Sequence, residues 1–301
     1  MRPNAAALAV RVALACSGGV ALGVALAPAA VPGYYLPPAG APYRTEEIRV
    51  RAGGEISLGG TLTVPVNGKR RHPAVVLISG QAPEDRDATS PGSPYRPFYD
   101  IADTLARRGI AALRLDDRGV GSSTGSLTTA TTVDRALDVQ AALDYLRRRP
   151  DADPLRLGLL GIGQGATIAT MIASVDTVIA ALVLMAPEPD SARPVRIPAL
   201  LMQGGADQVL PADASSRIAT AFQRAGATDV TIRLFDQLLN TFLDARTGAA
   251  AAGAPPAAFR LPQTVRGTIA DWVVTRLPAR PDPPAPVKKP AAKRRSKSRK
   301  S

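Results

Sequence analysis

The 301-residue sequence contains one cysteine, one histidine and few aromatic residues, which make up 4% of the chain. A single cysteine, Cys16, excludes an intramolecular disulfide and a cysteine-rich zinc site. A single histidine, His72, excludes a metal site built on a pair of histidines. No segment repeats at a fixed period, which argues against a solenoid or a propeller. The composition, 46% hydrophobic and 21% charged, is that of a globular protein, and the chain is long enough for one large α/β domain.

The formal net charge of +12 is concentrated at the ends of the chain. Residues 279–301 carry +8, and Arg2 and Arg11 add two positive charges at the other end, so about +2 remains for the body, an ordinary value for a folded domain. The basic side chains of the tail, set against Asp282, are Arg280, Lys288, Lys289, Lys293, Arg294, Arg295, Lys297, Arg299 and Lys300.

The tail, residues 279–301, has too few apolar residues to offset the entropy of ordering, so we expect it to be disordered. Its charge favours attachment to anionic lipid or to an envelope polymer, and the alternative is a solubilising tail with no fixed partner. Nucleic acid is the least expected partner if the protein is exported.

The amino-terminal segment, residues 1–31, has the pattern of an export signal. Residues 12–31 contain no charged side chain, and two arginines precede them. The pattern predicts a signal peptide, cleaved near Ala27-Pro28-Ala29, or a retained membrane anchor. Lipidation at Cys16 and a buried or disordered alanine-rich helix are weaker alternatives. A signal peptide or an anchor would place the body in the periplasm, outside the cell or anchored to the membrane.

Residues 32–44 are rich in proline and are predicted to be a linker.

Strands and helices alternate along residues 45–278, which we predict to form one domain. A turn at Gly53-Gly54 predicts a hairpin of two strands, at 47–51 and 55–64. Further strands are predicted at 74–79, 110–115, 155–162, 178–185, 199–202 and 230–235, most of them as buried apolar runs. Helical spacing predicts helices at 98–108, 132–149, 166–175, 212–225 and 264–277. In the helix 132–149 the expected buried side carries Val133, Leu137, Ala141 and Leu143 or Tyr145. This alternation predicts an α/β fold: a mostly parallel central sheet with helices on both faces, and a working site at the carboxyl ends of the strands.

Three loops at those strand ends carry recognisable motifs. They read Leu77-Ile78-Ser79-Gly80 followed by Pro83-Glu84-Asp85-Arg86-Asp87, then Asp116-Asp117-Arg118-Gly119, then Gly161-Ile162-Gly163-Gln164-Gly165. With these motifs in this order, residues 45–277 resemble the α/β-hydrolase superfamily, specifically its dienelactone-hydrolase and acyl-esterase-like branch. The resemblance implies a triad of a serine nucleophile in the third motif, an acid after the strand 199–202 and a histidine after the strand 230–235.

The sequence departs from that triad at two of its three positions. Gly163 stands at the nucleophile position and has no side chain to attack with, and Thr241 stands where the family usually has histidine. Asp207 matches the acid. Backbone N–H groups resembling an oxyanion hole would come from Gln164 and from Gly80 or Gln81.

The only histidine cannot replace the missing base. His72 precedes the first buried strand, so we expect it at the amino-terminal edge of the sheet, a strand's length or about 20 Å from the site. Beside Lys69, Arg70 and Arg71 it is expected to be a surface residue.

Three hypotheses for function follow. The first is an exported, catalytically inactive α/β-hydrolase-fold protein that binds a small ligand or a protein in its cleft. This cleft would be open, because only residues 186–198 separate two strands where many relatives insert a helical lid. The second is an active hydrolase on acyl esters that uses a non-standard site, for example Asp207, Asp116 or Asp117 and Asp85, although such carboxylates are more often structural partners of Arg86 and Arg118. The third is a structural envelope protein tethered by its basic tail. No cofactor and no metal is expected.

Overall fold

The computed structural model describes residues 37–80, 83–89, 93–245 and 259–279. The predicted signal peptide or anchor, residues 32–36 of the predicted linker, and all of the predicted basic tail beyond Ala279 lie outside the described residues. Among the described helices none is long and apolar enough to cross a bilayer.

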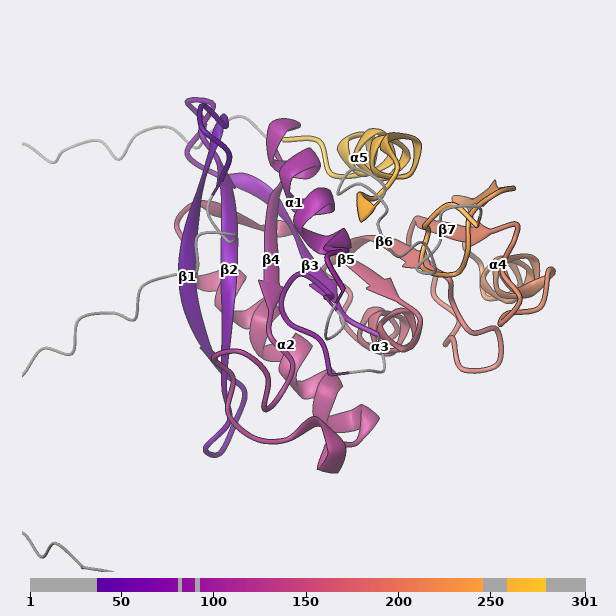
Figure 1. Cartoon of the computed structure of the whole chain (residues 1–301), viewed down its shortest axis with the longest axis horizontal. Coiled ribbons are helices and arrows are strands. Elements are labelled where there is room, and N and C mark those ends of the chain that lie inside the picture. The colour runs from indigo at the N-terminus through magenta and orange to yellow at the C-terminus, as the bar shows by residue number, and fades with distance from the viewer. Residues whose placement is uncertain (1–36, 81–82, 90–92, 246–258, 280–301) are drawn as a thin grey trace, which may run out of the picture.

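The strands form one eight-stranded sheet in the order β1-β2-β4-β3-β5-β6-β7-β8 (Figure 1). β1 and β2 pair antiparallel, β2 and β4 pair antiparallel, and every pairing from β4 to β8 is parallel. The strands are β1 Tyr43–Arg51, β2 Ser57–Pro65, β3 His72–Ile78, β4 Ala111–Leu115, β5 Ala152–Ile162, β6 Ile179–Met185, β7 Ala199–Gly204 and β8 Val230–Phe235. β1 thus begins two residues before the domain boundary expected from the sequence.

Helices cover both faces of this sheet, which confirms the predicted fold class. α1 and α5 pack on one face, and α2, α3 and α4 pack on the other (Figure 1). The helices are α1 Pro97–Arg107, α2 Thr132–Arg148, α3 Gln164–Ala173, α4 Ala214–Arg224 and α5 Gln263–Arg276, with a short 3₁₀ turn, η2, at Leu127–Thr129. Both interfaces are filled mainly by Leu, Ile, Val and Ala, as the scarcity of aromatics led us to expect.

The central strands are buried on both faces, and this fixes where their loops emerge. Every residue of β3 and of β7 is buried, and β6 has only one residue that is not. Since β3, β4, β5, β6, β7 and β8 run in the same direction, the loops that follow them meet at one edge of the sheet. This carboxyl edge holds Ser79, Asp116, Gly163, Asp207 and Thr241.

The buried side of α2 differs from the predicted one. Val133 and Leu137 are 59% and 54% exposed, and the buried residues are Arg135, Ala136, Val139, Ala142, Leu143 and Leu146. Small alanines let the helix lie close to the sheet, and Arg135 is buried because it meets a carboxylate there. The prediction is therefore confirmed for Leu143 and for Ala141 and Tyr145, which pack against the core, and it is wrong for Val133 and Leu137. Its beginning is fixed by a capping box between Thr131 and Asp134.

His72 is also not the surface residue that its basic neighbours suggested. It lies at the amino-terminal edge as predicted, but it is only 2% exposed. It is the first residue of β3, where its backbone N–H donates to the Asp151 carbonyl over 2.9 Å. Burial of the strand on both faces extends to this first position, whereas the three preceding basic residues are exposed.

The connection between β6 and β7 contains no helix or strand, as expected for a chain without a lid. It packs along α3 instead. The Ser191 and Thr167 hydroxyl oxygens lie 2.7 Å apart, and the Arg193 backbone N–H donates to Thr170 Oγ1 over 3.0 Å. The prolines at 187, 189, 194 and 198 suit such an extended path.

Candidate active site

Gly163 occupies the tip of a sharp turn between β5 and α3. Its backbone angles, φ +54° and ψ −119°, lie in a region that residues with side chains rarely adopt. A methyl group built on Gly163 meets no atom within 4 Å, so the space for a nucleophile's side chain is open. The backbone here has the geometry of a nucleophile elbow, and the tip presents only hydrogen.

The two flanking glycines are required by close packing. A Cβ on Gly161 would lie 2.2 Å from the Gly165 carbonyl oxygen, and a Cβ on Gly165 would lie 2.3 Å from the Ile78 carbonyl oxygen. Both distances are far below any real contact, so α3 can approach β3 and β5 only because side chains are absent at these positions. The spacing of glycines in the sequence thus reports the shape of the turn.

Asp207 follows β7 and keeps one oxygen without a partner. Its Oδ1 accepts hydrogen bonds from the backbone N–H groups of Val209 and Leu210 over 2.7 and 3.2 Å. Its Oδ2 is buried and has no hydrogen-bond partner among the described residues. Next to it, the Ala206 backbone N–H donates to the Leu238 carbonyl over 3.0 Å, so this loop lies against the loop that follows β8. In a complete triad, a histidine from that loop would donate to the acid.

Thr241 lies in that loop and is exposed. Its carbonyl oxygen accepts from the Tyr95 hydroxyl over 2.7 Å. The following residue, Phe242, has φ +62° and is fully buried, which anchors the turn in the core. The predicted position of Thr241, after the last strand and at the carboxyl edge, is where the structure has it.

The backbone N–H of Gly80, expected as an oxyanion-hole donor, already has a hydrogen-bond acceptor. The backbone N–H of Gly80 donates to Glu84 Oε2 over 3.0 Å. A methyl group on Gly80 would lie 3.7 Å from that same oxygen and 3.8 Å from the carbonyl oxygen of Ile162, the residue before Gly163. A carboxylate therefore sits beside the elbow. Gln81, the alternative donor, lies outside the described residues.

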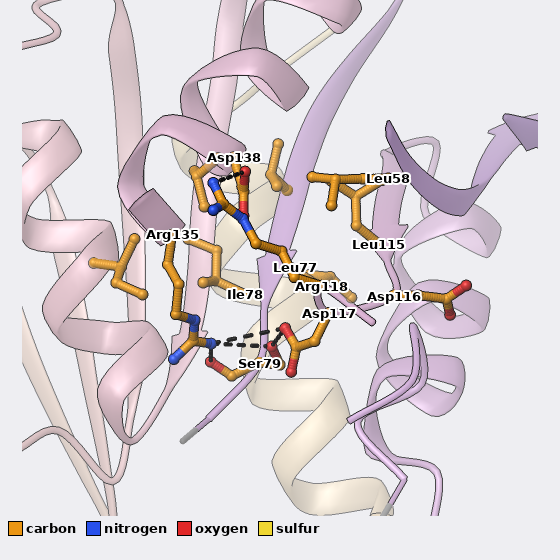
Figure 2. A pocket seen from close by; sticks show the side chains of 13 residues that line it. Leu58, Leu77, Ile78, Ser79, Leu115, Asp116, Asp117, Arg118, Arg135 and Asp138 are labelled. Carbon is orange, nitrogen blue, oxygen red and sulfur yellow. Dashed lines mark hydrogen bonds and ion pairs between the residues drawn. The ribbon is translucent and has the colours of Figure 1, made fainter. Parts of the chain in front are cut away.

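Arg135 joins both sides of this region. Its guanidinium donates to the Gln164 side-chain oxygen, and over 3.1 Å to the Ser79 carbonyl. The Ser79 hydroxyl donates to Asp117 Oδ1 over 2.6 Å (Figure 2). A small cavity of about 40 Å³ lies against these side chains, with room for a few water molecules. The sequence analysis did not identify Arg135 or Glu84 as residues of this region. The one signal for Arg135 was the pair of consecutive aspartates after a buried strand, because buried carboxylates need hydrogen-bond donors nearby.

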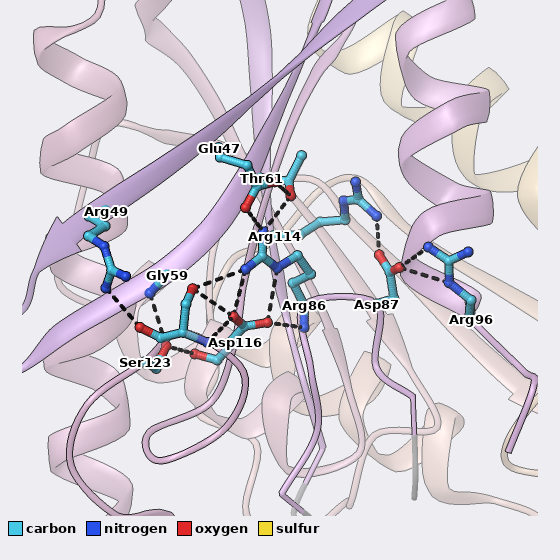
Figure 3. Close-up of polar contacts among 11 residues, drawn as sticks. Glu47, Arg49, Gly59, Thr61, Arg86, Asp87, Arg96, Arg114, Asp116 and Ser123 are labelled. Carbon is cyan, nitrogen blue, oxygen red and sulfur yellow. Dashed lines mark hydrogen bonds and ion pairs between the residues drawn. The ribbon is translucent and has the colours of Figure 1, made fainter. Parts of the chain in front are cut away.

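Asp116 has a structural role. Arg86 donates to it from Nε over 3.0 Å and from Nη2 over 2.7 Å, and the same guanidinium contacts Glu47 (Figure 3). Burial opposes ionisation of Asp116, but the hydrogen bonds and charge of Arg86 outweigh it and hold its pKa below the usual value. Arg118 pairs with Asp138 over 2.7 Å. The expectation that the strand-end carboxylates pair with Arg86 and Arg118 is met for Arg86, and it is wrong for Arg118, whose partner Asp138 lies on α2.

The carboxylates of the alternative active site are not brought together. Asp116 and Asp117 follow β4, whereas Asp207 follows β7, and three strands lie between them. At about 4.8 Å per strand the two ends are roughly 19 Å apart. Asp85 Oδ1 accepts from the backbone N–H groups of Asp87 and Thr89 and so stabilises a turn. Within the part of the chain that the structure describes, no group of three or more His, Cys, Asp or Glu side chains is placed to hold a metal ion.

We expect Glu84→Gln to raise the stability of the protein at neutral pH, by on the order of 1 kcal/mol. Burial raises the pKa of Glu84, the charge of Asp117 adds to the shift, and the hydrogen bond from Gly80 opposes it. A raised carboxyl pKa means that ionisation opposes folding, and that protonation relieves the penalty as the pH falls through the folded-state value. The advantage of the glutamine, which still accepts from Gly80, should therefore shrink in mild acid.

The measurement is thermal unfolding of the wild type and of this variant at several pH values. Glu55→Gln, at an exposed position, is the matched control and should change nothing. If Glu84→Gln lowered the melting temperature equally at every pH, the carboxylate would not be the desolvated group described here.

Comparisons with known proteins agree with the fold. A family model described as serine aminopeptidase, S33, matches residues 92–194. The sequence is 33% identical over 140 residues to esterase EstD of Thermotoga maritima, a match that covers 46% of this chain and 32% of the esterase. It is 28% identical over 175 residues to an uncharacterized protein of Mycobacterium tuberculosis, covering 50% of this chain and 57% of that protein. The chain therefore matches less than two thirds of the length of either relative.

Solved structures resemble most of the chain. The dienelactone hydrolase from Anabaena variabilis has a TM-score of 0.58 and 21% identity, covering 78% of this chain and 99% of that one. The Pyrococcus furiosus esterase Pf2001 also has a TM-score of 0.58, with 16% identity, covering 78% of this chain and 94% of that one. At these identities the likeness establishes the fold, and the chemistry has to be argued from the side chains.

Proposed function

We propose that the chain is an exported, catalytically inactive member of the α/β-hydrolase superfamily that uses the region around its elbow for binding. The observation that carries the proposal is Gly163. The turn has the backbone shape that presents a nucleophile, and the residue at its tip has no side chain. A missing nucleophile removes the acyl-enzyme route altogether.

Two further observations support inactivity. The chain has a single histidine, and it lies at the opposite edge of the sheet from Gly163, so no imidazole can act as the general base. The Gly80 N–H is bonded to the Glu84 carboxylate, whose negative charge would repel a developing oxyanion. The nucleophile, the general base and the oxyanion hole are thus each compromised: the first by Gly163, the second by the distant position of His72 and the third by Glu84. Of the triad, only the acid Asp207 is retained. The export proposal rests on the sequence of residues 1–31 alone.

The test is hydrolysis of a p-nitrophenyl ester by the wild type and by Asp207→Ala. We expect neither protein to exceed the rate of buffer. Turnover by the wild type that Asp207→Ala abolishes would contradict the proposal and support the alternative, an active hydrolase on acyl esters with a non-standard site. The observation that favours this alternative is that similar proteins are named as esterases.

We expect Gly163→Ser to lower the melting temperature without creating esterase activity. A side chain fits in the open space, but serine is strained at φ +54°, which costs on the order of 1–3 kcal/mol. No base is present to activate the hydroxyl. Differential scanning fluorimetry and the same ester assay measure the two effects.

Gly267→Ser is the matched control. It lies in α5, where a Cβ also meets no atom within 4 Å and φ is not positive. Serine is a better helix former than glycine, so this substitution should not destabilise the protein. A melting temperature raised by Gly163→Ser would count against the assignment of the elbow.

A further inference from the structure

β8 lies at one edge of the sheet. It pairs with β7 on one side, and within the described residues no strand pairs with it on the other. Figure 1 shows β7 and α4 at the end of the sheet opposite β1. Leu234, near the end of β8, is 57% exposed. The unpaired side of an edge strand presents N–H and C=O groups that can pair with a further strand.

The backbone groups on the unpaired side come from alternate residues of β8. The carbonyl oxygens of Asp229 and Phe235 accept from backbone N–H groups of β7 and of the residue after it, over 2.9 and 2.8 Å. In a parallel ladder alternate residues bond to the same neighbour, so the N–H and C=O groups of Val230, Ile232 and Leu234 point away from β7. These three residues therefore present the backbone edge to any further strand.

The two edges of the sheet differ in charge. β1, at the opposite edge, has five charged side chains among nine residues: Arg44, Glu46, Glu47, Arg49 and Arg51. β8 has one among six, Arg233, and it contains no proline. Charged side chains and prolines on an edge strand oppose pairing with a further strand, so β1 is protected in this way and β8 is not.

Arg233 makes the one contact found, among the described residues, with the outward backbone groups of β8. Its Nη1 donates to the Ile232 carbonyl over 3.1 Å. Arg233 is exposed, and its side chain forms none of the salt bridges between described residues. The guanidinium can therefore swing away and leave the Ile232 carbonyl to a strand N–H.

The outward residues form an apolar row that is complementary to itself. Val230 and Ile232 pack against the core on the face of the sheet that α4 covers, and Leu234 shares that face because side chains alternate along a strand. A second β8, running antiparallel about a two-fold axis at Ile232, places Val230 of each copy opposite Leu234 of the other. All three outward residues then form hydrogen-bonded pairs, and the exposed Leu234 side chain is covered.

The neighbouring symmetric registers fit less well. An axis moved by one residue toward the end of the strand puts Arg233 directly opposite Arg233 of the second copy, and like charges in that position are destabilising. An axis moved by one residue toward the start leaves Leu234 opposite Thr228, which precedes the strand. The register centred on Ile232 avoids both faults.

The same register gives Arg233 polar neighbours from the second copy. It lies opposite Thr231 of that copy, with Asp229 two residues further along on the same face. Asp229 bonds Arg276 over 3.0 Å, but its side chain is 35% exposed, and a carboxylate can accept from more than one cation. Reaching toward Asp229 also carries each Arg233 guanidinium away from its symmetry-related copy. Charge complementarity therefore favours a second copy of this chain over an unrelated strand.

We infer that two copies of this chain associate through β8, antiparallel and with Ile232 on the two-fold axis, so that their sheets join into one continuous sheet. Because the two copies run in opposite directions, their carboxyl edges face opposite ways, and the two Gly163 turns lie at opposite edges of the dimer. Three strands of each copy, β6, β7 and β8, separate each turn from the axis. The inference goes beyond the proposed function and does not depend on catalytic inactivity.

The first experiment is sedimentation of the full chain over a range of micromolar concentrations. We expect the wild type to form dimers and Leu234→Lys to raise the dissociation constant roughly a hundredfold or more, because symmetry makes the substitution act twice in each dimer. Val175→Lys is the matched control. Val175 is 76% exposed and lies outside β8, so this variant adds the same charge and should leave the dissociation constant within about twofold.

A cysteine cross-link tests the register directly. The Cα atoms of a hydrogen-bonded antiparallel pair lie about 5.5 Å apart, within the range of a disulfide. Cys16 is the only cysteine of the chain, so the variants are made with Cys16→Ser. We expect Ile232→Cys to form a covalent dimer under mild oxidation. Leu234→Cys, at a more exposed position, should form roughly tenfold less, because its two copies would lie about 14 Å apart along the strands.

Three results would overturn the inference. A dimer that Leu234→Lys leaves intact would place the interface elsewhere. Equal cross-linking of Ile232→Cys and Leu234→Cys would indicate random encounters in place of a fixed register. A monomer in which the Ile232 and Leu234 amides are protected from hydrogen exchange would show that another part of the same chain covers β8. The ester assay reports on the Gly163 turn, so its outcome and this one are independent.

Discussion

Replacement of Asp116 by alanine is expected to cost about 3–5 kcal/mol of stability, the range for breaking a buried ion pair. The carboxylate is fully buried and accepts from the Arg86 side chain, from the Arg86 backbone N–H over 2.9 Å and from the Ser122 backbone N–H over 3.0 Å. Without it, the guanidinium of Arg86, whose side chain is 3% exposed, loses the carboxylate that it contacts through both Nε and Nη2, while its contacts with Glu47, Thr61 and Ser122 remain. The loss is large because a buried charge is deprived of its bidentate partner.

Urea unfolding of the wild type and of Asp116→Ala measures this loss of unfolding free energy. In thermal unfolding, the melting temperature of the variant should be lower by roughly 6–20 °C. The matched control is Asp190→Ala. Asp190 also pairs with an arginine, Arg217, but its side chain is 82% exposed, so water screens the pair and the change should be below about 1 kcal/mol. A loss at Asp116 no greater than that at Asp190 would show that the pair is not buried as described.

The pH dependence gives a second check on the same carboxylate. The pKa of Asp116 is lowered, so its contribution is complete above its unfolded-state pKa, near 3.9, and is lost only as the pH falls through the still lower folded-state value. The difference between wild type and Asp116→Ala should therefore stay constant from neutral to mildly acidic pH and narrow only in strong acid. This is opposite to the behaviour expected at Glu84, whose pKa is raised.

The fold could be predicted because its signals are local and repeated. Apolar runs mark most of the parallel strands, such as residues 74–78 in β3 and 179–185 in β6, and glycine or proline marks most of the boundaries, such as Gly109 after α1 and Pro150 after α2. Strand direction then places the loops at one edge, so the predicted positions of Asp207 and Thr241 needed no knowledge of side-chain contacts. The order of the helices and strands, and the residues that follow each of them, could therefore be predicted from the sequence.

The contacts across the site could not be predicted, because they join residues that are distant in the chain. Arg135 meets Ser79 across 56 residues, and nothing near position 135 marks it as buried. Glu84 lies only four residues from Gly80, but no local pattern indicates that its carboxylate turns back onto that backbone N–H. The same limitation explains the error at Val133 and Leu137 of α2, where alanines and a paired arginine face the sheet and Val133 faces water. Both ion pairing and apolarity can bring a side chain into the core, and a single sequence shows which residues are apolar but not which charged residues are paired.

Replacement of Gly165 by alanine is expected to destabilise the protein by about 3 kcal/mol or more, the upper range for overpacking. The new Cβ would lie 2.3 and 2.4 Å from the carbonyl oxygens of Ile78 and Ser79, both backbone atoms at the end of a buried strand. Neither can give way without moving β3, so α3 would have to shift off the sheet. Gly163→Ala is the matched variant: its Cβ meets no atom within 4 Å and bears only the cost of a positive φ, about 1–2 kcal/mol.

Comparison of the two alanine variants by urea unfolding separates the packing requirement at Gly165 from the backbone requirement at Gly163. A larger loss at Gly165 than at Gly163 means that the glycines at 161 and 165 are imposed by packing, whether or not the turn carries a nucleophile. Equal losses would show that α3 is not packed closely on β3 and would remove the basis for treating this turn as an elbow. The flanking glycines are therefore evidence of the fold alone. Of the three glycines in the turn, Gly163 is the one where a side chain would fit, so it is the residue that bears on activity.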